Sequence, residues 1–322
     1  MQAIEPEVEG FMENFLIQPE DIWQPTDFLP DPQSDGFLDH VEQLREESKE
    51  LGYDFWVTMV ADTITEEALP TYESWLMDVV GVDQHGEYKT NGWAKWVRAW
   101  TAEENRHGDV LNKYLYLSGR VNMREIEITT QHLISDGFDI GTDRDPYKNF
   151  VYTSFQELAT NISHKRVGQM AKKKGNTLLG KMCTIIAGDE MRHHLAYREF
   201  VKTIIGHDPN GTMLAFADMM KQKIVMPAHF LRESGESIGT AFEKFSICAQ
   251  RLGVYTAQDY IEILKKLNTY WDLENIRSLN ESAEKARDYL LKLPARLQRI
   301  SERMQFTDEE YRFKWVEANG IM

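Results

Sequence analysis

Apolar residues recur along most of this chain at intervals of three and four, which is the spacing of one face of an α-helix. The longest stretches with this pattern contain little proline or glycine. Turn signals such as Gly81–Asp83 and Asp208–Gly211 separate them. The pattern predicts helices over residues 36–52, 53–80, 92–117, 147–174, 177–205, 212–226, 240–252, 257–267 and 282–304.

The two ends of the chain depart from this pattern. Four prolines between positions 19 and 32 predict little helix over Pro19–Ser34, and residues 1–34 are expected to form an extended lead-in. Residues 306–322 form a tail in which Tyr311–Val316 and Ala318–Met322 favour a short β-hairpin. No internal linker is visible, so we expect residues 1–322 to fold as one all-α domain.

Composition narrows the possible classes of protein. The formal net charge of −16 argues against a general nucleic-acid binder, because such proteins neutralise phosphates with lysine and arginine. No run of about 18 apolar residues occurs, so the sequence predicts no membrane span. The first twenty residues lack the basic and apolar regions of a secretory signal. The two cysteines, Cys183 and Cys248, suit a reducing compartment.

One predicted helix carries a glutamate and a histidine in the middle of an apolar face. Glu104 and His107 are three residues apart, so their side chains point the same way. A buried carboxylate without a partner costs several kcal/mol or takes up a proton, so this position needs an explanation. The face, spaced by three and four residues, comprises Trp93, Trp96, Trp100, Glu104, His107, Leu111 and Tyr114.

A second predicted helix repeats the arrangement. Glu190 and His193 interrupt an apolar face, and both local sequences read acidic-Glu-x-Arg-His. Glu and His at positions i and i+3 can both bind one cation, and a set of oxygen and imidazole ligands suits iron or manganese. The face comprises Cys183, Ile186, Glu190, His193, Tyr197, Phe200 and Ile204.

Two further helices each offer one glutamate, Glu66 and Glu157. One glutamate followed by Glu-x-x-His, twice along the chain, is the ligand set of di-iron carboxylate helix bundles. Four carboxylates carry a charge of −4 and two ferrous ions carry +4, so the reduced centre would be neutral. A single Glu-x-x-His is more often a solvated helix face, but two in apolar surroundings favour the metal centre.

Neighbouring polar residues are expected to lie outside the ligand set. His194 is four residues from Glu190 and has the spacing to reach a metal, but the match between the two repeats selects His193. Glu67 and Glu73 are interpreted as surface residues or as residues behind the ligands. The repeat also suggests that Asp189 orients His107 and that Glu103 orients His193.

Several longer strings resemble the soluble plant-type acyl-carrier-protein desaturases. The similarity is collinear from about Trp23 to about Arg303 and is far more specific than the ligand pattern. The strings that carry it are WQPTDFLPDP (Trp23–Pro32), TEEALPTY (Thr65–Tyr72), WTAEENRHGDVLNKYLYLSGRV (Trp100–Val121), YTSFQELATNISH (Tyr152–His164), DEMRH (Asp189–His193), LAFADMM (Leu214–Met220), MPAH (Met226–His229) and QRLGVYTAQDY (Gln250–Tyr260).

This resemblance implies a ferritin-like bundle enlarged by additional helices and assembled as a homodimer. It implies two ferrous ions per subunit and the insertion of a cis double bond, at position 9, into a saturated acyl chain on acyl carrier protein. Ferredoxin would donate two electrons, and dioxygen would become water. The ligands would be Glu66, Glu104, His107, Glu157, Glu190 and His193, with Thr160 in proton delivery and Trp23 and Asp189 on an electron path toward His107.

The same resemblance leaves some properties open. The compartment would be a bacterial cytoplasm or, after removal of a transit peptide, a plastid stroma. Trp75 is bulkier than the residues usual in the family, and we expect it to shorten the acyl cavity and favour chains of about sixteen carbons. Acidic partners would need a local positive surface. The dense cluster that offers one comprises Lys165, Arg166, Lys172, Lys173, Lys174 and Lys181, with Arg192 as an extension.

Competing classes use a similar ligand set. Iron-storage ferritins need only the four-helix core, so the added C-terminal helices and the proline-rich lead-in would have no role there. Radical-generating di-iron subunits need a redox-active tyrosine beside one iron. An inactive acyl-carrier-binding relative is disfavoured because all six ligand residues are present.

Overall fold

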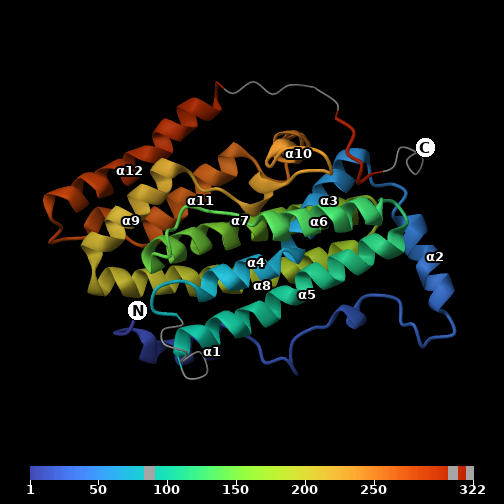
Figure 1. The fold of residues 1–322 in the computed structure, drawn as a ribbon, viewed down its shortest axis with the longest axis horizontal. Coiled ribbons are helices and arrows are strands. Elements are labelled where there is room, and N and C mark those ends of the chain that lie inside the picture. The colour runs from blue at the N-terminus through green and yellow to red at the C-terminus, as the bar shows by residue number, and fades with distance from the viewer. Residues whose placement is uncertain (83–90, 304–310, 317–322) are drawn as a thin grey trace.

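Two antiparallel helix pairs form the centre of the molecule. A computed structural model describes residues 1–82, 91–303 and 311–316. In it, α3 (Tyr53–Glu67) packs against α5 (Gly92–Ser118), and α7 (Pro146–Lys173) packs along α8 (Thr177–His207). The long helices lie along the long axis of the molecule (Figure 1). The expected all-α class is confirmed, and the described residues contain no strand.

Local sequence explains where the long central helices begin. Side-chain oxygens of Asn91, Asp145 and Asn176 accept hydrogen bonds from backbone N–H groups in the first turns of α5, α7 and α8. Pro146 follows its cap as the first residue of α7, where a missing N–H costs nothing. Gly119 ends α5 in the left-handed conformation, which glycine adopts without strain.

The single helix expected over residues 53–80 is wrong. The structure divides it into α3 and α4 (Leu69–Met77), with Ala68 at the junction. Pro70 is the reason, because it lacks a backbone N–H and its ring clashes with the preceding turn. The break lies directly after Glu66 and Glu67, where Ala68 has φ −76° and ψ 16° and so leaves the helical conformation.

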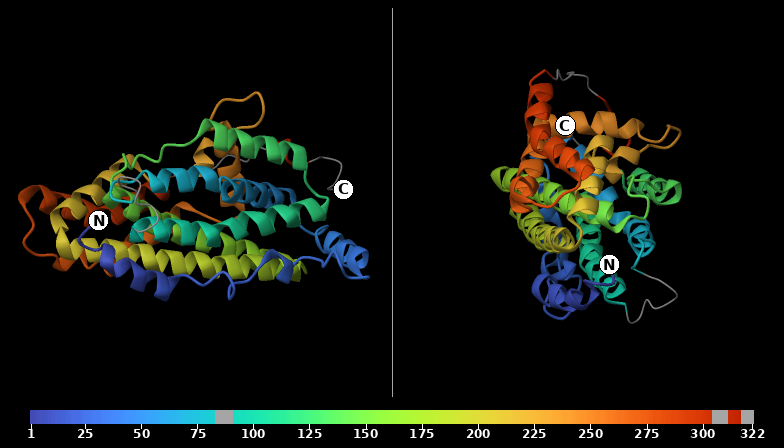
Figure 2. Two further views of the ribbon diagram at one scale, coloured as in Figure 1. Left: turned by 60° about the horizontal axis from the view of Figure 1, so that its bottom comes forward. Right: turned by 90° about the vertical axis from the view of Figure 1, so that its left-hand side faces the viewer.

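Further helices cover one side of the central pairs, as the two views in Figure 2 show. This side is built by α9 (Pro209–Gln222), the 3₁₀ helix η3 (Pro227–Phe230), α10 (Thr240–Leu252), α11 (Ala257–Tyr270), η4 (Leu273–Asn275) and α12 (Glu281–Ser301). The sequence pattern did not identify α6 (Met123–Asp136), which packs on α3. Among the described helices, none combines the length and apolar character needed to cross a membrane.

The N-terminal region is more ordered than an extended lead-in. It contains η1 (Glu5–Glu7) and α1 (Val8–Phe15), so the expectation of an extended segment over residues 1–34 is wrong for its first half. Residues 19–34 do hold little helix, with only η2 (Pro25–Asp27) before α2 (Phe37–Glu47). Helix α1 packs on α5 and α8, which places the chain after it alongside the central bundle.

The C-terminal segment is anchored without forming a strand. The expected first strand, Tyr311–Val316, has no β-structure, and its partner at 318–322 lies outside the described residues. Phe313 and Trp315 are instead buried side chains. The Trp315 indole N–H donates to Thr129 Oγ1 at 2.9 Å, and its carbonyl accepts from the Asn122 N–H at 2.7 Å. Side-chain burial rather than strand pairing therefore holds this segment.

We predict that Trp315→Ala lowers the free energy of unfolding by about 3–5 kcal/mol, because it removes a fully buried indole and leaves a cavity. Urea unfolding monitored by circular dichroism measures the change. Arg312→Ala, at an exposed position in the same segment, is the control and should cost less than about 0.5 kcal/mol. Equal stability of the two variants would contradict the anchoring of this segment.

Candidate metal centre

The six residues singled out by the sequence converge from four helices. Glu66 comes from α3, Glu104 and His107 from α5, Glu157 from α7, and Glu190 and His193 from α8. They form two groups in which potential ligand atoms lie within 4.8 Å of one another. One group is Glu66, Glu104, His107 and Glu190, and the other is Glu104, Glu157, Glu190 and His193. Glu104 and Glu190 belong to both groups, so the arrangement consists of two half-sites joined by two shared carboxylates.

The two histidines direct equivalent atoms into this centre. His107 Nδ1 lies 3.2 Å from both Glu104 Oε2 and Glu190 Oε1. His193 Nδ1 lies 2.6 Å from Glu104 Oε1 and 3.6 Å from Glu157 Oε2. Each helix places its Glu and His one turn apart on the face toward the other pair, as the i, i+3 spacing requires.

Each histidine has a carboxylate on the side away from the centre. His107 Nε2 lies 3.2 Å from Asp189 Oδ2, and His193 Nε2 lies 3.0 Å from Glu103 Oε2. A carboxylate accepts a hydrogen bond from Nε2–H, which leaves Nδ1 unprotonated and able to bind a metal. The structure therefore has both pairings expected from the repeat, His107 with Asp189 and His193 with Glu103.

Arg192 joins these two carboxylates. Its Nη2 donates to Glu103 Oε2 at 2.8 Å and to Asp189 Oδ1 at 2.5 Å. Hydrogen bonds from His107 and Arg192 outweigh the effect of burial and lower the pKa of Asp189 to about 2. The expectation that Arg192 extends a positive surface is wrong, because its charge is shared between two acidic neighbours.

The centre has properties that a bound cation would relieve. Burial raises the pKa of Glu66 to about 7 and raises that of Glu157 well above its usual range. Burial also disfavours ionised Glu104, but His107 and His193 outweigh it and keep the pKa of Glu104 below the usual range. Within this centre, four buried atoms lie close to other ligand atoms but make no hydrogen bond of normal geometry, namely Glu104 Oε1, Glu157 Oε2, His107 Nδ1 and His193 Nδ1. Carboxylate oxygens and imidazole nitrogens with this convergence fit iron or manganese.

The other expected residues lie beside the centre. Thr160 Oγ1 is 2.5 Å from Glu190 Oε2 and donates to it. The Trp23 indole N–H donates to Asp189 Oδ2 at 2.8 Å. Its ring is nearly parallel to that of His107, with 6.1 Å between the centroids. Trp23, Asp189 and His107 thus form a continuous chain of contacts from the N-terminal segment to the centre.

Sequence reasoning missed a third histidine, which contacts the ligand candidate Glu66. His164 is fully buried on α7, with Nε2 3.1 Å from Glu66 Oε1 and Nδ1 3.3 Å from Asp62 Oδ2. Trp100 has the corresponding place in the other half, where its indole N–H donates to Glu157 Oε1 at 3.2 Å. The available signal was the seven-residue spacing of Glu157 and His164, which places both on one helix face.

Residues expected outside the ligand set do lie outside it. Nδ1 of His194 is paired with the Ser154 carbonyl at 2.8 Å, and burial lowers the pKa of His194 to about 4. Glu67 accepts a hydrogen bond from Asn112 at 2.6 Å. Neither residue contributes an atom to the two groups around Glu104 and Glu190.

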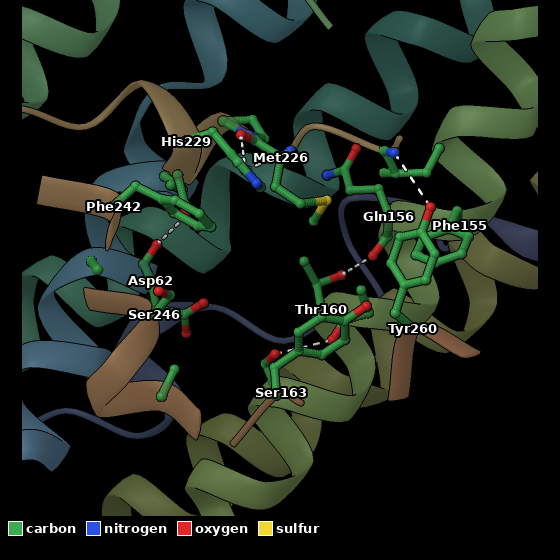
Figure 3. A pocket seen from close by; sticks show the side chains of 18 of the residues that line it. Asp62, Phe155, Gln156, Thr160, Ser163, Met226, His229, Phe242, Ser246 and Tyr260 are labelled. Carbon is green, nitrogen blue, oxygen red and sulfur yellow. Dashed lines mark hydrogen bonds between the residues drawn. The ribbon is translucent and has the colours of Figure 1, made fainter. Parts of the chain in front are cut away.

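An apolar cavity of about 480 Å³ begins at the carboxylates. It is bordered by Glu66, Glu104 and Glu190 at the centre and extends between α3 and α7 toward α10, α11 and the end of α12. Figure 3 shows Thr160 of α7, Phe242 of α10 and Tyr260 of α11 around this space. The shape and lining fit a flexible hydrocarbon chain.

Trp75 does not contribute to the cavity wall as expected. From α4, the cavity is lined by Leu69 and Tyr72, whereas the Trp75 indole packs edge-on against Tyr152 with 5.9 Å between ring centroids. The helix is interrupted at Ala68, between Glu66 and Trp75, so an extrapolation along one continuous helix from Glu66 does not place this side chain. The expected preference for sixteen-carbon chains therefore loses its structural basis.

The fold and centre define a class, a helical bundle with two Glu/His half-sites that share two carboxylates beside an apolar cavity. Residues 1–317 match the family model described as fatty acid desaturase, and the chain belongs to this family. It is 50% identical over 311 residues to stearoyl-[acyl-carrier-protein] 9-desaturase 5, chloroplastic, of Arabidopsis thaliana, covering 95% of this chain and 78% of that protein. It is 52% identical over 305 residues to stearoyl-[acyl-carrier-protein] 9-desaturase 2, chloroplastic, of Oryza sativa subsp. indica, covering 94% and 76%.

A solved structure supports the ferritin-like fold. DesA2 of Mycobacterium tuberculosis H37Rv, a candidate acyl-acyl-carrier-protein desaturase, superimposes with a TM-score of 0.54. The match covers 88% of this chain and 98% of DesA2 at 17% sequence identity, so it speaks for the fold alone.

The close approach of α3 and α5 at the centre generates a prediction. A Cβ atom at Gly108 would lie 3.1 Å from backbone atoms of Glu66 and Glu67. Gly108→Ala should therefore push the helices apart and lower the free energy of unfolding by about 1–3 kcal/mol. Gly188→Ala, where a Cβ meets nothing within 4 Å, should instead stabilise by roughly 0.5–1 kcal/mol. Chemical denaturation tests both, and a neutral Gly108→Ala would contradict the predicted crowding.

Proposed function

We propose that this chain is an acyl-carrier-protein desaturase that inserts a cis double bond, at position 9, into a saturated acyl chain. The observation that carries the proposal is the pair of half-sites sharing Glu104 and Glu190 at the end of an apolar cavity. The names of the plant relatives support acyl carrier protein as the carrier of the substrate. We further propose that residues 1–322 act as one domain in a homodimer, in a bacterial cytoplasm or a plastid stroma.

Six residues would hold two ferrous ions per chain. Glu66 and His107 would bind one ion, Glu157 and His193 the other, and Glu104 and Glu190 would bind both. This assignment follows the two groups of converging atoms and uses the four buried atoms that make no hydrogen bond of normal geometry. When bound, the irons would supply what no side chain can supply, the activation of dioxygen for removal of two hydrogens from adjacent methylenes. Those two hydrogens, two electrons from ferredoxin and two protons convert dioxygen to two waters.

The chain's own residues would place the acyl chain and control access. Apolar side chains along the cavity exclude water and hold the methylenes beside Glu66 and Glu190, with burial worth roughly 0.8 kcal/mol per methylene. Thr160 donates to Glu190 and borders the same cavity, so its hydroxyl is placed to deliver a proton there. Trp23 and Asp189 contact His107 from the opposite side, where ferredoxin electrons would enter.

Basic residues beside the cavity offer a docking surface for acyl carrier protein. Lys292, Arg296, Arg299 and Arg303 are spaced by four, three and four residues along α12 and the residues just after it, and all are exposed. Leu297, Ile300 and Ser301 of the same helix line the cavity. A carrier bound to this basic row would bring its tethered acyl chain to the cavity. Since acyl carrier proteins are acidic, the row complements their charge.

The lysine cluster at the α7–α8 turn is a second candidate surface. Lys172, Lys173 and Lys174 are exposed, as expected from the sequence. Arg166 is not available to a partner in the same way, because it donates two 2.6 Å hydrogen bonds to Asp259. The α12 row is favoured for the acyl carrier because it adjoins the cavity lining directly.

The proposal as a whole is tested by incubation with saturated acyl carriers of several lengths, ferredoxin, its reductase and dioxygen, followed by analysis of the products. Purified protein should bind about two irons per chain, measured by elemental analysis. Glu104→Ala should lose most of both irons and abolish turnover, because this carboxylate is shared. Glu67→Ala, one residue from Glu66 but outside the centre, should retain both. Full iron content and turnover in Glu104→Ala would refute the ligand assignment.

The docking surface is tested by charge reversal. The pair Arg296→Glu and Arg299→Glu should raise the KM for the acyl carrier on the order of tenfold at low salt, with kcat and iron content unchanged. The effect should shrink as salt reduces the Debye length below about 8 Å. Lys172→Glu with Lys173→Glu makes the same change of charge elsewhere and is the matched control. A raised KM in the lysine pair alone would assign docking to the α7–α8 turn.

A further inference from the structure

Glu103, the carboxylate behind His193, has different partners at its two oxygens. Oε2 lies 3.0 Å from His193 Nε2 and accepts a hydrogen bond from Arg192 at 2.8 Å. Oε1 accepts a 2.6 Å hydrogen bond from the backbone N–H of Ile17. Glu103 is only 2% exposed, so water cannot readily replace a missing partner. A residue 86 positions away in sequence thus completes the hydrogen bonding of this carboxylate.

The same stretch of backbone also contacts Arg192. Arg192 Nη1 donates to the Phe15 carbonyl at 2.7 Å, while its Nη2 donates to Glu103 and Asp189. The Phe15 carbonyl and the Ile17 N–H, which lie two residues apart in one short segment, therefore hold both members of the Glu103–Arg192 ion pair. Charge-assisted hydrogen bonds of this kind are stronger than neutral ones and restrict rotation of the groups that they join.

Helix α1 fixes the position of this segment. The helix ends at Phe15, and the Leu16 N–H still donates to the Met12 carbonyl at 3.0 Å. Phe11 packs edge-on against Phe200 of α8 with 4.9 Å between ring centroids. The segment beyond α1 follows the edge of the bundle formed by α5 and α8, as Figure 2 shows. The apolar contact of Phe11 with Phe200 therefore fixes the segment so that its backbone groups face Glu103 and Arg192.

We propose that the backbone of Phe15–Ile17 is a positioning element of the metal centre, which fixes the Glu103–Arg192 pair and through it the ring of His193. The inference rests on the proposed metal binding. Without the Ile17 N–H, Glu103 can rotate to satisfy its free oxygen, and its alignment with His193 is lost. His107 faces Asp189, which shares Arg192 with Glu103 but also has Trp23 as a partner of its own and no bond to the Ile17 N–H. The segment therefore acts on the His193 half-site more than on the His107 half-site.

Ile17→Pro removes the single N–H in question. The preceding residue, Leu16, has φ −108° and ψ 152°, the extended conformation that a residue before proline prefers. Co²⁺ added to metal-free protein is the probe, with visible absorption reporting each equivalent. Loss of a partner behind a ligand histidine typically weakens metal binding 10–100-fold, and we expect about tenfold for the second equivalent. The first equivalent should bind as in the wild type.

Ile17→Ala is the matched control, since it shortens the side chain and keeps the N–H. It should bind both equivalents as the wild type does. Equal weakening in the alanine and proline variants would assign the effect to side-chain packing and overturn the proposal, as would wild-type binding in Ile17→Pro. Wild-type protein that binds fewer than two Co²⁺ ions would instead count against the proposed metal centre itself.

Hydrogen exchange gives a second test that needs no substitution. Coupling between two sites is reciprocal, so loading the wild type with Co²⁺ should slow exchange of the Ile17 amide severalfold. The Leu16 amide, bonded within α1, is the internal reference and should change less. Unchanged exchange at Ile17 on metal loading would overturn the proposal, even if Ile17→Pro failed to fold.

Discussion

Four carboxylates enclosed together in the interior of a helical bundle are the constraint on which the rest of this structure depends. Each carboxylate loses solvation on burial, and each repels the others, so the raised pKa values of Glu66 and Glu157 express the cost. The large aromatic side chains around them exclude water and make that cost greater. A pair of divalent cations would turn the same geometry from unfavourable to favourable, because both the charge and the buried atoms without a normal hydrogen bond would be satisfied.

The residues behind the ligands make the two similar halves of the centre unequal. Both histidines have a carboxylate at Nε2, and Arg192 joins those carboxylates. Glu66 and Glu157, which each belong to one half, differ more in their hydrogen-bond partners. Glu66 is paired with the ionisable His164, whereas Glu157 is paired with the neutral indole of Trp100. The two halves therefore repeat the same ligand types in sequence, but the charges of the residues around them differ.

The sequence was most informative where spacing alone determines geometry. Glu-x-x-His on two amphipathic helices was sufficient to identify four converging residues, and the pairing of Glu103 with His193 followed from the repeat. Trp75 was misplaced because the single helix expected from Glu66 to Trp75 is interrupted at Ala68, just before Pro70. The contacts of Arg192 with Glu103 and Phe15, and that of Ile17 with Glu103, were beyond prediction for a different reason, since they join residues far apart in sequence and follow no periodicity.

The arrangement separates two sides of the centre. The cavity is lined by α3, α7 and the added helices α9 to α12, so an acyl chain would approach from there. Asp189, Glu103 and the N-terminal segment lie behind the histidines of α5 and α8, and they line no part of that cavity in the described chain. Reductant and substrate would consequently reach the metals from different sides. The added C-terminal helices then have a physical role that an iron-storage bundle does not require, because they enclose the space for the hydrocarbon.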